Sequence, residues 1–256
     1  MSSYAELHCL SNFTFLRGAS HPAELVHQAY ALGYRALALT DECSISGVVR
    51  AHVAARELGL QFIIGSEFTL NNGDKFVLLV TNKNGYRQLT RLITLARRRT
   101  PKGEYHLTVD DLRAKSLSDC LSLVVCDPSP TPMERKHAKF QAISDHAKRF
   151  KSLMPNRVWL TLEQPGYGTD ECHQKSLETL SENLEIPIVA TGNVHMHCRA
   201  RQPLQDTLTA IRHQKSILNI KHCLAANAER HLRSKKFLKH LYRKTALNHS
   251  IQIAEQ

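Results

Sequence analysis

The sequence predicts an α/β protein, with a (β/α) barrel as the favoured architecture and an open doubly wound sheet as the alternative. Three observations lead to this prediction. Short apolar runs of strand length alternate with amphipathic segments of helical period along most of the chain. About six or seven such runs can be counted. The 256 residues, 42% of them hydrophobic, are enough to bury one large core or two small ones.

The first third of the chain shows the alternation most clearly. A strand at 5–10 is followed by a Pro-led amphipathic helix at 21–33, a strand at 35–40, a helix at 46–59 and a strand at 62–68. This βαβαβ order is typical of a parallel sheet with right-handed crossover connections.

The alternation continues beyond this point. A strand is predicted at 75–81, and 84–99 has the pattern of an amphipathic helix whose arginines lie at its C-terminal end, where the helix dipole favours them. The remaining strands and helices are expected at 120–126, 133–154, 157–163, 170–185, 186–192 and 202–214. After residue 220 the chain becomes basic and helical. We therefore expect a barrel domain of residues 1–220, followed by a helical connector of residues 221–256.

The charge of the chain is its strongest compositional signal. The net charge is +11 and the pI is about 9.4, which indicates a polyanionic partner such as nucleic acid. Basic residues cluster at 97–102 and, without any acid, at 230–244. The candidate nucleic-acid contacts in these clusters are Arg97, Arg98, Arg99, Lys102, Arg233, Lys235 and Lys236. A solvated basic surface without a bound polyanion is the alternative interpretation.

The location of the protein follows from what the sequence does not contain. No run reaches the roughly 18 apolar residues of a membrane span, and the first ten residues lack a secretion signal pattern. The seven cysteines show no CxxC spacing, which argues against a zinc ribbon or a disulfide scaffold. We expect a cytoplasmic protein with reduced cysteines, most of them in the core, and no membrane partner.

Polar residues at the ends of the predicted strands are the candidates for chemistry. In a parallel barrel, the carboxyl ends of all strands meet at one mouth. The side chains that would gather there are His8, Asp41, Glu42, Glu67, Glu163, His195 and His197. Imidazole nitrogens and carboxylate oxygens together suit Zn, Mn or Fe.

Each of these residues also has a purely structural interpretation. His8 on an apolar strand is more often a hydrogen-bonded core histidine than a ligand, and Asp41 can cap a helix or turn. Glu67 can be a solvated strand end, and fifteen histidines make chance pairs common. The sequence contains no phosphate-binding GxxxxGK[ST] or GxGxxG motif, no GxSxG elbow and no HExxH motif. The joint placement at strand ends therefore favours a metal site over any ATPase or dehydrogenase chemistry.

Several long stretches resemble one known family. They are "YAELHCLSNFTFLRGASHPAELV", "ALGYRALALTDECSISGVVRAHVAARELGL", "FIIGSEF", "VHMHCRARQPLQDTLTAIR" and "NAERHLRS". They resemble the N-terminal PHP (polymerase and histidinol phosphatase) domain of bacterial C-family DNA polymerases, most closely the error-prone, damage-inducible branch. The resemblance covers nearly the whole chain, from residue 4 to about 242.

The resemblance implies a fold and a partner. The fold is a distorted seven-stranded (β/α) barrel of the PHP type, with up to three metals at the strand ends in active members. In that family, polymerase activity lies in palm, fingers and thumb domains, which this sequence does not include. The implied partners are DNA, the polymerase core toward which the connector would lead, and other replication or repair proteins.

The family's metal motifs can be compared with this sequence position by position. Active members have a His-x-His after the first strand, whereas this sequence has His8 followed by Leu10. The second motif, Thr-Asp-His, ends here in Glu42, which replaces an imidazole by a carboxylate. A carboxylate near the glycine of the first motif is missing, because Arg17 precedes Gly18.

The later motifs are also changed. Glu67 matches the bridging glutamate, and the final Asp-x-His is present as Asn193 and His195. His106 and Glu163 are the candidates for the family's middle ligands. A neutral amide holds a divalent ion less well than a carboxylate, and an arginine repels cations. These departures argue against a three-metal hydrolytic centre.

Three hypotheses follow. The first is a degenerate, non-catalytic PHP domain of an error-prone DNA polymerase that acts in translesion synthesis, serving as a scaffold and interaction module. The second is an active metal-dependent phosphoesterase or 3′–5′ proofreading exonuclease. The third is a truncated remnant without function. For the mouth we expect either no metal or one divalent ion, Zn or Mn, held by His8, Glu42, Glu67 and His195.

Overall fold

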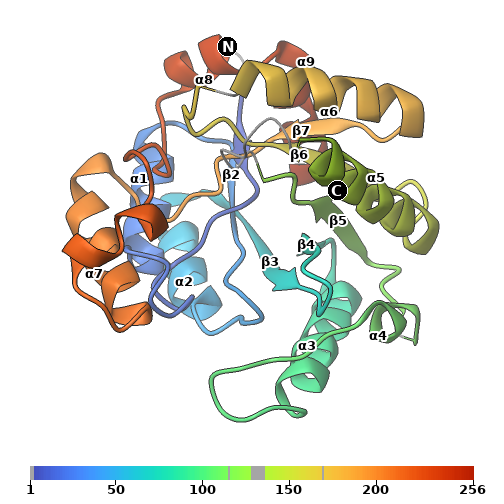
Figure 1. Ribbon diagram of the computed structural model, residues 1–256, viewed down its shortest axis with the longest axis horizontal. Helices are drawn as coiled ribbons and strands as arrows, with labels where there is room; N and C mark the ends of the chain where they lie inside the picture. Colours follow the sequence, from blue (N-terminus) through green and yellow to red (C-terminus); the bar gives the residue numbers. More distant parts are fainter. Residues whose placement is uncertain (1–2, 115, 128–135, 169) are drawn as a thin grey trace.

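A computed structural model describes residues 3–114, 116–127, 136–168 and 170–256 (Figure 1). Seven strands form one curled sheet in which each strand neighbours the next one along the chain. The strands are β1 Ala5–Glu6, β2 Ala36–Leu39, β3 Gln61–Thr69, β4 Lys75–Val80, β5 Cys120–Val124, β6 Val158–Leu162 and β7 Ile188–Ala190. Each lies within a predicted strand segment, apart from small differences at the ends.

Helices connect most of the strands and cover the outside of the sheet (Figure 1). They are α1 Pro22–Ala31, α2 Val48–Leu58, α3 Lys83–Arg97, α4 Val109–Ala114, α5 Lys136–Leu153, α6 Asp170–Leu184, α7 Gln202–Arg212, α8 Lys235–Leu241 and α9 Lys244–Ala254. Short 3-10 turns, η2 Arg199–Arg201, η3 Ile217–Asn219 and η4 Lys221–Cys223, surround α7. The first three residues of the helix predicted at 133–154 lie outside the described residues.

The sheet is parallel except at β4. This strand runs antiparallel to both β3 and β5, whereas the other neighbours are parallel. The physical reason is the connection at 70–74, which is too short for the crossover that a parallel neighbour needs. The start of β4 therefore lies at the mouth, together with the ends of the other strands.

The two edge strands meet beyond their ends and close the barrel at its mouth. The Leu10 amide donates to the Val194 carbonyl (2.8 Å), and the Val194 amide donates to the His8 carbonyl (2.9 Å). These bonds form a parallel bridge between Cys9 and Val194. The predicted distorted seven-stranded (β/α) barrel is confirmed.

The inside of the barrel is filled by small and large apolar side chains from every strand. Ala36 and Ala38 of β2 leave room for larger residues such as Leu121 and Trp159. Helix α9 contributes Ile253 to the same cluster and so closes the base of the barrel. Helix α9 lies in the predicted connector of residues 221–256 and packs into this core, while the boundary between residues 220 and 221 stays a prediction.

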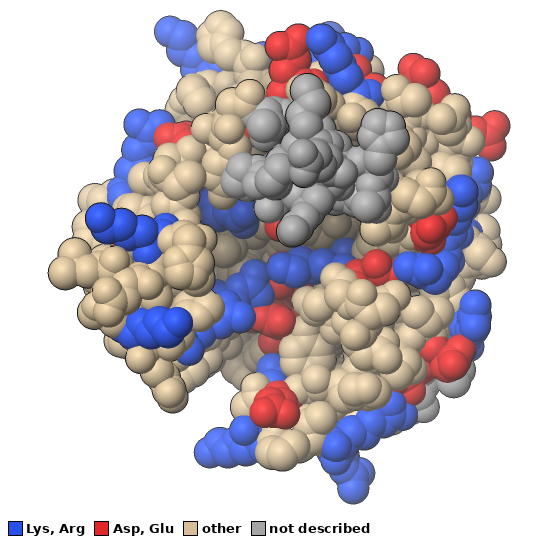
Figure 2. Space-filling model, viewed as in Figure 1, with Lys and Arg blue, Asp and Glu red and all other residues tan. Residues whose placement is uncertain are grey.

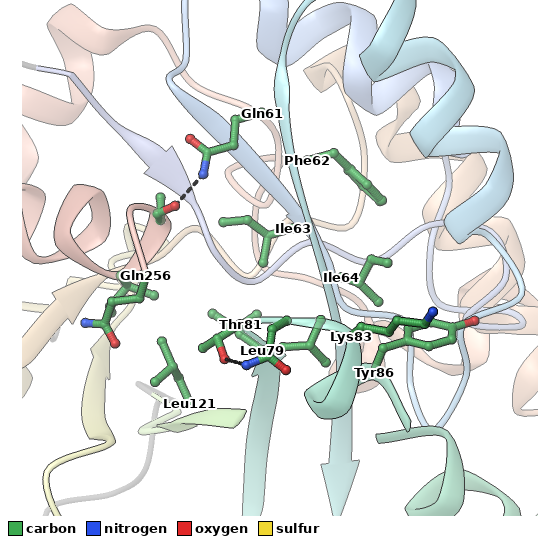
Figure 3. A pocket seen from close by; sticks show the side chains of 14 residues that line it. Gln61, Phe62, Ile63, Ile64, Leu79, Thr81, Lys83, Tyr86, Leu121 and Gln256 are labelled. Atoms are coloured by element: carbon green, nitrogen blue, oxygen red, sulfur yellow. Dashed lines mark hydrogen bonds between the residues drawn. The ribbon is translucent and has the colours of Figure 1, made fainter. Parts of the chain in front are cut away.

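Figure 3 shows the base of the barrel, where α9 approaches β3. The Gln61 side-chain amide donates to the Ala254 carbonyl, which fixes the end of α9 against β3. A pocket of about 430 Å³ lies beside this contact, lined by apolar residues of β3, β4 and α9 and by Tyr86 of α3.

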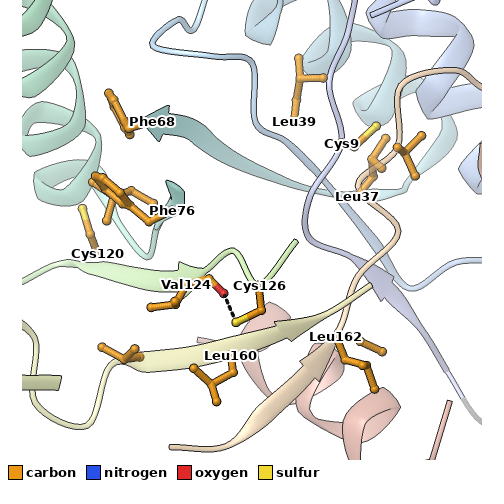
Figure 4. Close-up of a cluster of buried hydrophobic side chains, with 14 of the residues drawn as sticks. Cys9, Leu37, Leu39, Phe68, Phe76, Cys120, Val124, Cys126, Leu160 and Leu162 are labelled. Atoms are coloured by element: carbon orange, nitrogen blue, oxygen red, sulfur yellow. Dashed lines mark hydrogen bonds between the residues drawn. The ribbon is translucent and has the colours of Figure 1, made fainter. Parts of the chain in front are cut away.

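The outer core lies between the sheet and the helices (Figure 4). Leu37, Leu39 and Leu160 point outward from their strands into this layer. Phe76 stacks on Phe68 (5.4 Å between ring centroids) and contacts Phe150 of α5 (4.7 Å), which ties β3 and β4 to this helix. Four cysteines, Cys9, Cys43, Cys120 and Cys126, are buried, as the sequence predicted for most of them.

The segment before α8 is fastened to the barrel by buried polar contacts. The Arg233 guanidinium donates to the carbonyls of Gln164 (2.9 Å) and Glu229 (2.6 Å), and the Arg233 carbonyl accepts from the Tyr34 hydroxyl (2.7 Å). Across the described residues, no helix is both long enough and apolar enough to cross a membrane.

Candidate functional site

The barrel mouth gathers most of the residues predicted from strand ends. A cavity of about 270 Å³ opens there, and its lining includes Arg17, Lys75 and His195. An adjoining hollow of about 500 Å³ is lined in part by Glu42 and Tyr105. The space-filling view shows a hollow in this face with Lys and Arg along it and a few acidic residues between them (Figure 2).

His8 lies at the centre of the site between two carboxylates. Its Nε2 is 2.8 Å from Glu67 Oε2, and its Nδ1 is 3.1 Å from Glu163 Oε1. Burial by itself lowers the pKa of His8, but the hydrogen bonds and charges of Glu163 and Glu67 outweigh it and raise the pKa to about 9. The raised pKa favours the imidazolium at neutral pH, in which both ring nitrogens donate to these carboxylates.

Glu67 is fully buried and surrounded by positive charge. Arg17 Nη1 lies 2.7 Å from Glu67 Oε1, and Lys75 Nζ lies 3.8 Å from the same oxygen. Burial raises the pKa of Glu67, but Arg17, Lys75 and His8 together hold it well below its usual range. The carboxylate is ionised, and three cationic groups compensate its charge.

Arg17 also binds Glu42, so that one guanidinium nitrogen joins two carboxylates. Its Nη1 is 2.5 Å from Glu42 Oε2, and the other carboxylate oxygen of Glu42 accepts from the Tyr105 hydroxyl (2.9 Å). The two glutamates lie side by side because their backbones form a bridge beyond the end of β2. Arg17 thus holds the position between Glu42 and Glu67 that a bridging cation would take.

The loop that carries Arg17 depends on a glycine and on Asp41. A Cβ at Gly18 would lie 1.9 Å from the Ser11 carbonyl oxygen, so a larger residue there would force the loop open. Asp41 accepts from the Ser11 amide (2.8 Å), the Ser11 hydroxyl (2.7 Å) and the Thr14 hydroxyl (2.7 Å). Asp41 therefore shapes this loop, which agrees with the turn-capping interpretation.

A chain of hydrogen bonds continues from Glu163 to His195. Asn193 Nδ2 donates to Glu163 Oε2 (2.9 Å), so its Oδ1 faces His195 Nε2 (3.0 Å), which must donate. His195 Nδ1 then accepts from the Gln205 amide (2.7 Å). Burial, with Arg230 and Arg17 nearby, holds the pKa of His195 well below its usual range. His195 is therefore neutral, and Asn193 separates it from the carboxylates.

Other predicted residues lie outside this network. His197 Nδ1 is 2.8 Å from the Ser20 hydroxyl at the start of α1, away from His8. His106 is exposed and lines the adjoining hollow. Two cations of the mouth, Lys75 and Arg230, were not predicted from the sequence. Burial raises the pKa of Glu163, but His8 and the nearby Arg230 lower it below its usual value. Lys75 begins a strand, and a parallel arrangement would place it at the opposite end of the barrel. The short connection at 70–74 was the sequence signal for an antiparallel strand, and therefore for Lys75 at the mouth.

The seven basic candidates are placed in different environments. Arg97 donates to the carbonyls of Cys43 (3.2 Å) and Glu42 (3.2 Å), so it orders the mouth. Arg99 pairs with Asp111 (2.7 Å), and Arg233 is only 5% exposed. The exposed or half-exposed candidates outside such contacts are Arg98, Lys102, Lys235 and Lys236.

The residues of the mouth do not fit a divalent metal. A guanidinium separates Glu42 from Glu67, both nitrogens of His8 lie within hydrogen-bond distance of carboxylates, and Asn193 stands between His195 and Glu163. In the described ranges, no three His, Cys, Asp or Glu side chains are grouped so that they could hold a metal ion. The four residues expected as metal ligands are instead bound to other side chains of the chain by hydrogen bonds and ion pairs. They are His8, Glu42, Glu67 and His195.

Comparisons with known proteins agree with this architecture. The chain is 46% identical to an error-prone DNA polymerase of Methylococcus capsulatus over 253 residues, covering 99% of this chain and 23% of that protein. It is also 46% identical to an error-prone DNA polymerase of Dechloromonas aromatica, covering 99% of this chain and 24% of that protein. The chain spans about a quarter of the length of these relatives.

A solved structure supports the fold. An amidohydrolase from Chromobacterium violaceum, solved with sulfate and without metal, superposes with a TM-score of 0.52 at 15% identity, covering 76% of this chain and 88% of that one. The family model of the PHP domain matches residues 6–164, which is more than half of the chain. This chain therefore belongs to the PHP domain family.

Proposed function

We propose that this chain is the PHP domain of an error-prone DNA polymerase that acts in damage-induced translesion synthesis, and that it serves there as a non-catalytic scaffold and interaction module. The observation that supports the non-catalytic role is the position of Arg17 between Glu42 and Glu67. The assignment to an error-prone DNA polymerase rests on the extent of the similarity to the named relatives. In such a protein the polymerase core would be the immediate partner of this domain, and the setting would be cytoplasmic.

The network gives the scaffold its rigidity. His8 joins Glu67 of β3 to Glu163 at the end of β6, and Asn193 and His195 continue the connection to α7. A buried charge is costly unless it is paired and hydrogen-bonded. Each carboxylate here has such partners from within the chain, so the mouth keeps its shape without a metal.

DNA contact is the proposed interaction. The net charge of +11 favours binding to phosphates, and Arg98, Lys102, Lys235 and Lys236 are the candidates that remain at the surface. We leave Arg97, Arg99 and Arg233 out of this set because their guanidiniums already bind groups of the chain.

The alternative is a metal-dependent phosphoesterase or 3′–5′ exonuclease. The observation in its favour is the neutral His195, which lines the cavity and could serve as a ligand after a rearrangement. It requires that a metal displace Arg17 and deprotonate His8.

An exonuclease assay separates the two proposals. The purified chain is incubated with a mismatched primer and Mn²⁺, and nucleotide release is measured. A non-catalytic domain releases none above the level of a His195→Ala variant. Manganese-dependent release that the variant abolishes would establish the alternative.

A further inference from the structure

The outer side of α7 and η3 carries exposed apolar residues that the fold does not use. Leu204 is 40% exposed, Ile211 55%, Ile217 41% and Leu218 77%. Isolated apolar residues are common on protein surfaces, but these four lie within fifteen residues of sequence, on α7 and on η3, which contacts α7. We propose that this α7–η3 patch docks an acidic amphipathic helix of a partner protein.

Helix α7 has its polar side toward the barrel and its apolar side toward solvent. At about 100° per residue, Leu204, Leu208 and Ile211 fall within an arc of about 60° on the outer side. On the inner side, Gln205 is 5% exposed and binds His195, and Thr209 lines the mouth cavity. The apolar stripe therefore contributes little to the core and is free to bind another surface.

The turn after α7 brings η3 next to this helix. The Gln214 amide donates to the Ile211 carbonyl (3.0 Å), and the Lys215 amide donates to the Ala210 carbonyl (3.1 Å), which turns the chain back at the end of the helix. Ile220 is 1% exposed and anchors η3 next to α7. Figure 1 shows α7 at the outside of the molecule, away from the strands.

The charge around the patch selects the partner. Lys215 and Lys221, on either side of η3 in the sequence, are exposed, and the exposed Arg212 ends α7 on the side that lines the mouth. The acid in this segment is Asp206, whose carboxylate accepts from the Gln202 amide (2.7 Å). Figure 2 shows Lys and Arg among uncharged side chains on this lobe. An apolar stripe with a cationic rim is complementary to a helix that presents leucines flanked by glutamate or aspartate.

Other occupants fit the patch less well. A second copy of the chain would place the same cations opposite each other, which opposes self-association. Nucleic acid would leave the apolar centre of the patch without a partner. This inference deepens the interaction role of the proposed function, but it concerns a surface other than the proposed DNA contacts. Loss of DNA binding would therefore leave it standing.

The test uses three synthetic helical peptides that share one leucine face and carry Glu, Gln or Lys on the other face. Binding to the full chain is measured by fluorescence anisotropy at low and high salt. The Glu peptide is expected to bind at least about tenfold more tightly than the Gln peptide and to weaken with salt, and the Lys peptide is expected not to bind. Ile211→Ser and Leu218→Ser should each weaken the Glu peptide about tenfold.

The matched control is Val49→Ser on α2, since Val49 is 71% exposed and lies outside the patch. This variant should bind the Glu peptide like the unmodified chain, and all variants should keep the thermal midpoint of the parent. Equal binding of the three peptides, no binding up to about 1 mM, or binding unaffected by Ile211→Ser and Leu218→Ser would each overturn the proposal. Displacement of the Glu peptide by a single-stranded oligonucleotide, or self-association of the chain that both serine variants abolish, would also overturn it.

Discussion

Replacement of Arg17 by methionine removes the cation between Glu42 and Glu67 while keeping most of the side-chain volume. Glu67 is 0% exposed and would keep His8 at 2.8 Å and Lys75 at 3.8 Å. Glu42 is 23% exposed and would keep the Tyr105 hydroxyl. Breaking a buried ion pair typically costs about 3–5 kcal/mol.

Two features place the expected effect below that range. Two cations remain near Glu67, and water can reach Glu42. We therefore expect Arg17→Met to lower the free energy of unfolding by about 2–3 kcal/mol at pH 7. The loss should be smaller at acid pH, where Glu67 can be protonated once Arg17 no longer lowers its pKa.

Urea denaturation followed by circular dichroism measures this change. The double variant Arg17→Met with Glu67→Gln should recover part of the loss, because it leaves no uncompensated charge on residue 67. A change of less than about 0.5 kcal/mol in the single variant, or no coupling between the two positions, would refute the role assigned to Arg17.

Three further predictions concern single groups. The folded-state pKa of His8 is raised from 6.5 to about 9, so protonation of His8 stabilises the fold by about 3 kcal/mol. This stabilisation is complete below pH 6.5 and is lost as the pH rises toward 9. Urea denaturation over a series of pH values should show this decrease in the free energy of unfolding, and His8→Gln should abolish it. Asn193→Asp places a second carboxylate against Glu163 and should destabilise the chain by about 1–3 kcal/mol at pH 7, less at pH 5. A difference in thermal midpoint between variant and parent that does not change with pH would contradict this. Lys102→Ala should weaken DNA binding and reduce its salt dependence without changing the stability of the fold, whereas Arg233→Ala should mainly lower that stability. The reverse pattern in anisotropy and melting experiments would disprove the assignment of Lys102 to DNA contact and of Arg233 to the fold.

The hydrophobic pattern predicted the strands because it depends on local sequence, but it did not predict strand direction at β4. That direction decides the site, since it brings Lys75 to the mouth beside Glu67. The sequence also identified Arg17 as a residue that repels cations. Its actual role, as the cation that binds two glutamates, depends on contacts between residues 25 and 50 positions apart.

Local composition was a poor guide to the basic surface. Arg97 and Arg233 stand in basic clusters, yet both direct their guanidiniums to backbone carbonyls. Burial of a long side chain is set by tertiary packing, which a count of neighbouring charges does not report. Helix α9 is a similar case. It follows a basic segment that we expected to belong to a connector, yet it fills the base of the barrel.

Arg17 holds the position between Glu42 and Glu67 that a bridging cation would take, and the proposed non-catalytic role depends on this arrangement. Its most direct test is the metal content of the purified chain after incubation with excess Mn²⁺ or Zn²⁺ and removal of free ion. The comparison is a variant with Leu10→His, Arg17→Glu and Asn193→Asp, which restores the ligand types that the family's motifs require. We predict a stoichiometry near zero for the chain itself and bound metal in the variant. One or more equivalents of metal in the chain itself, lost on His8→Ala, would contradict the account.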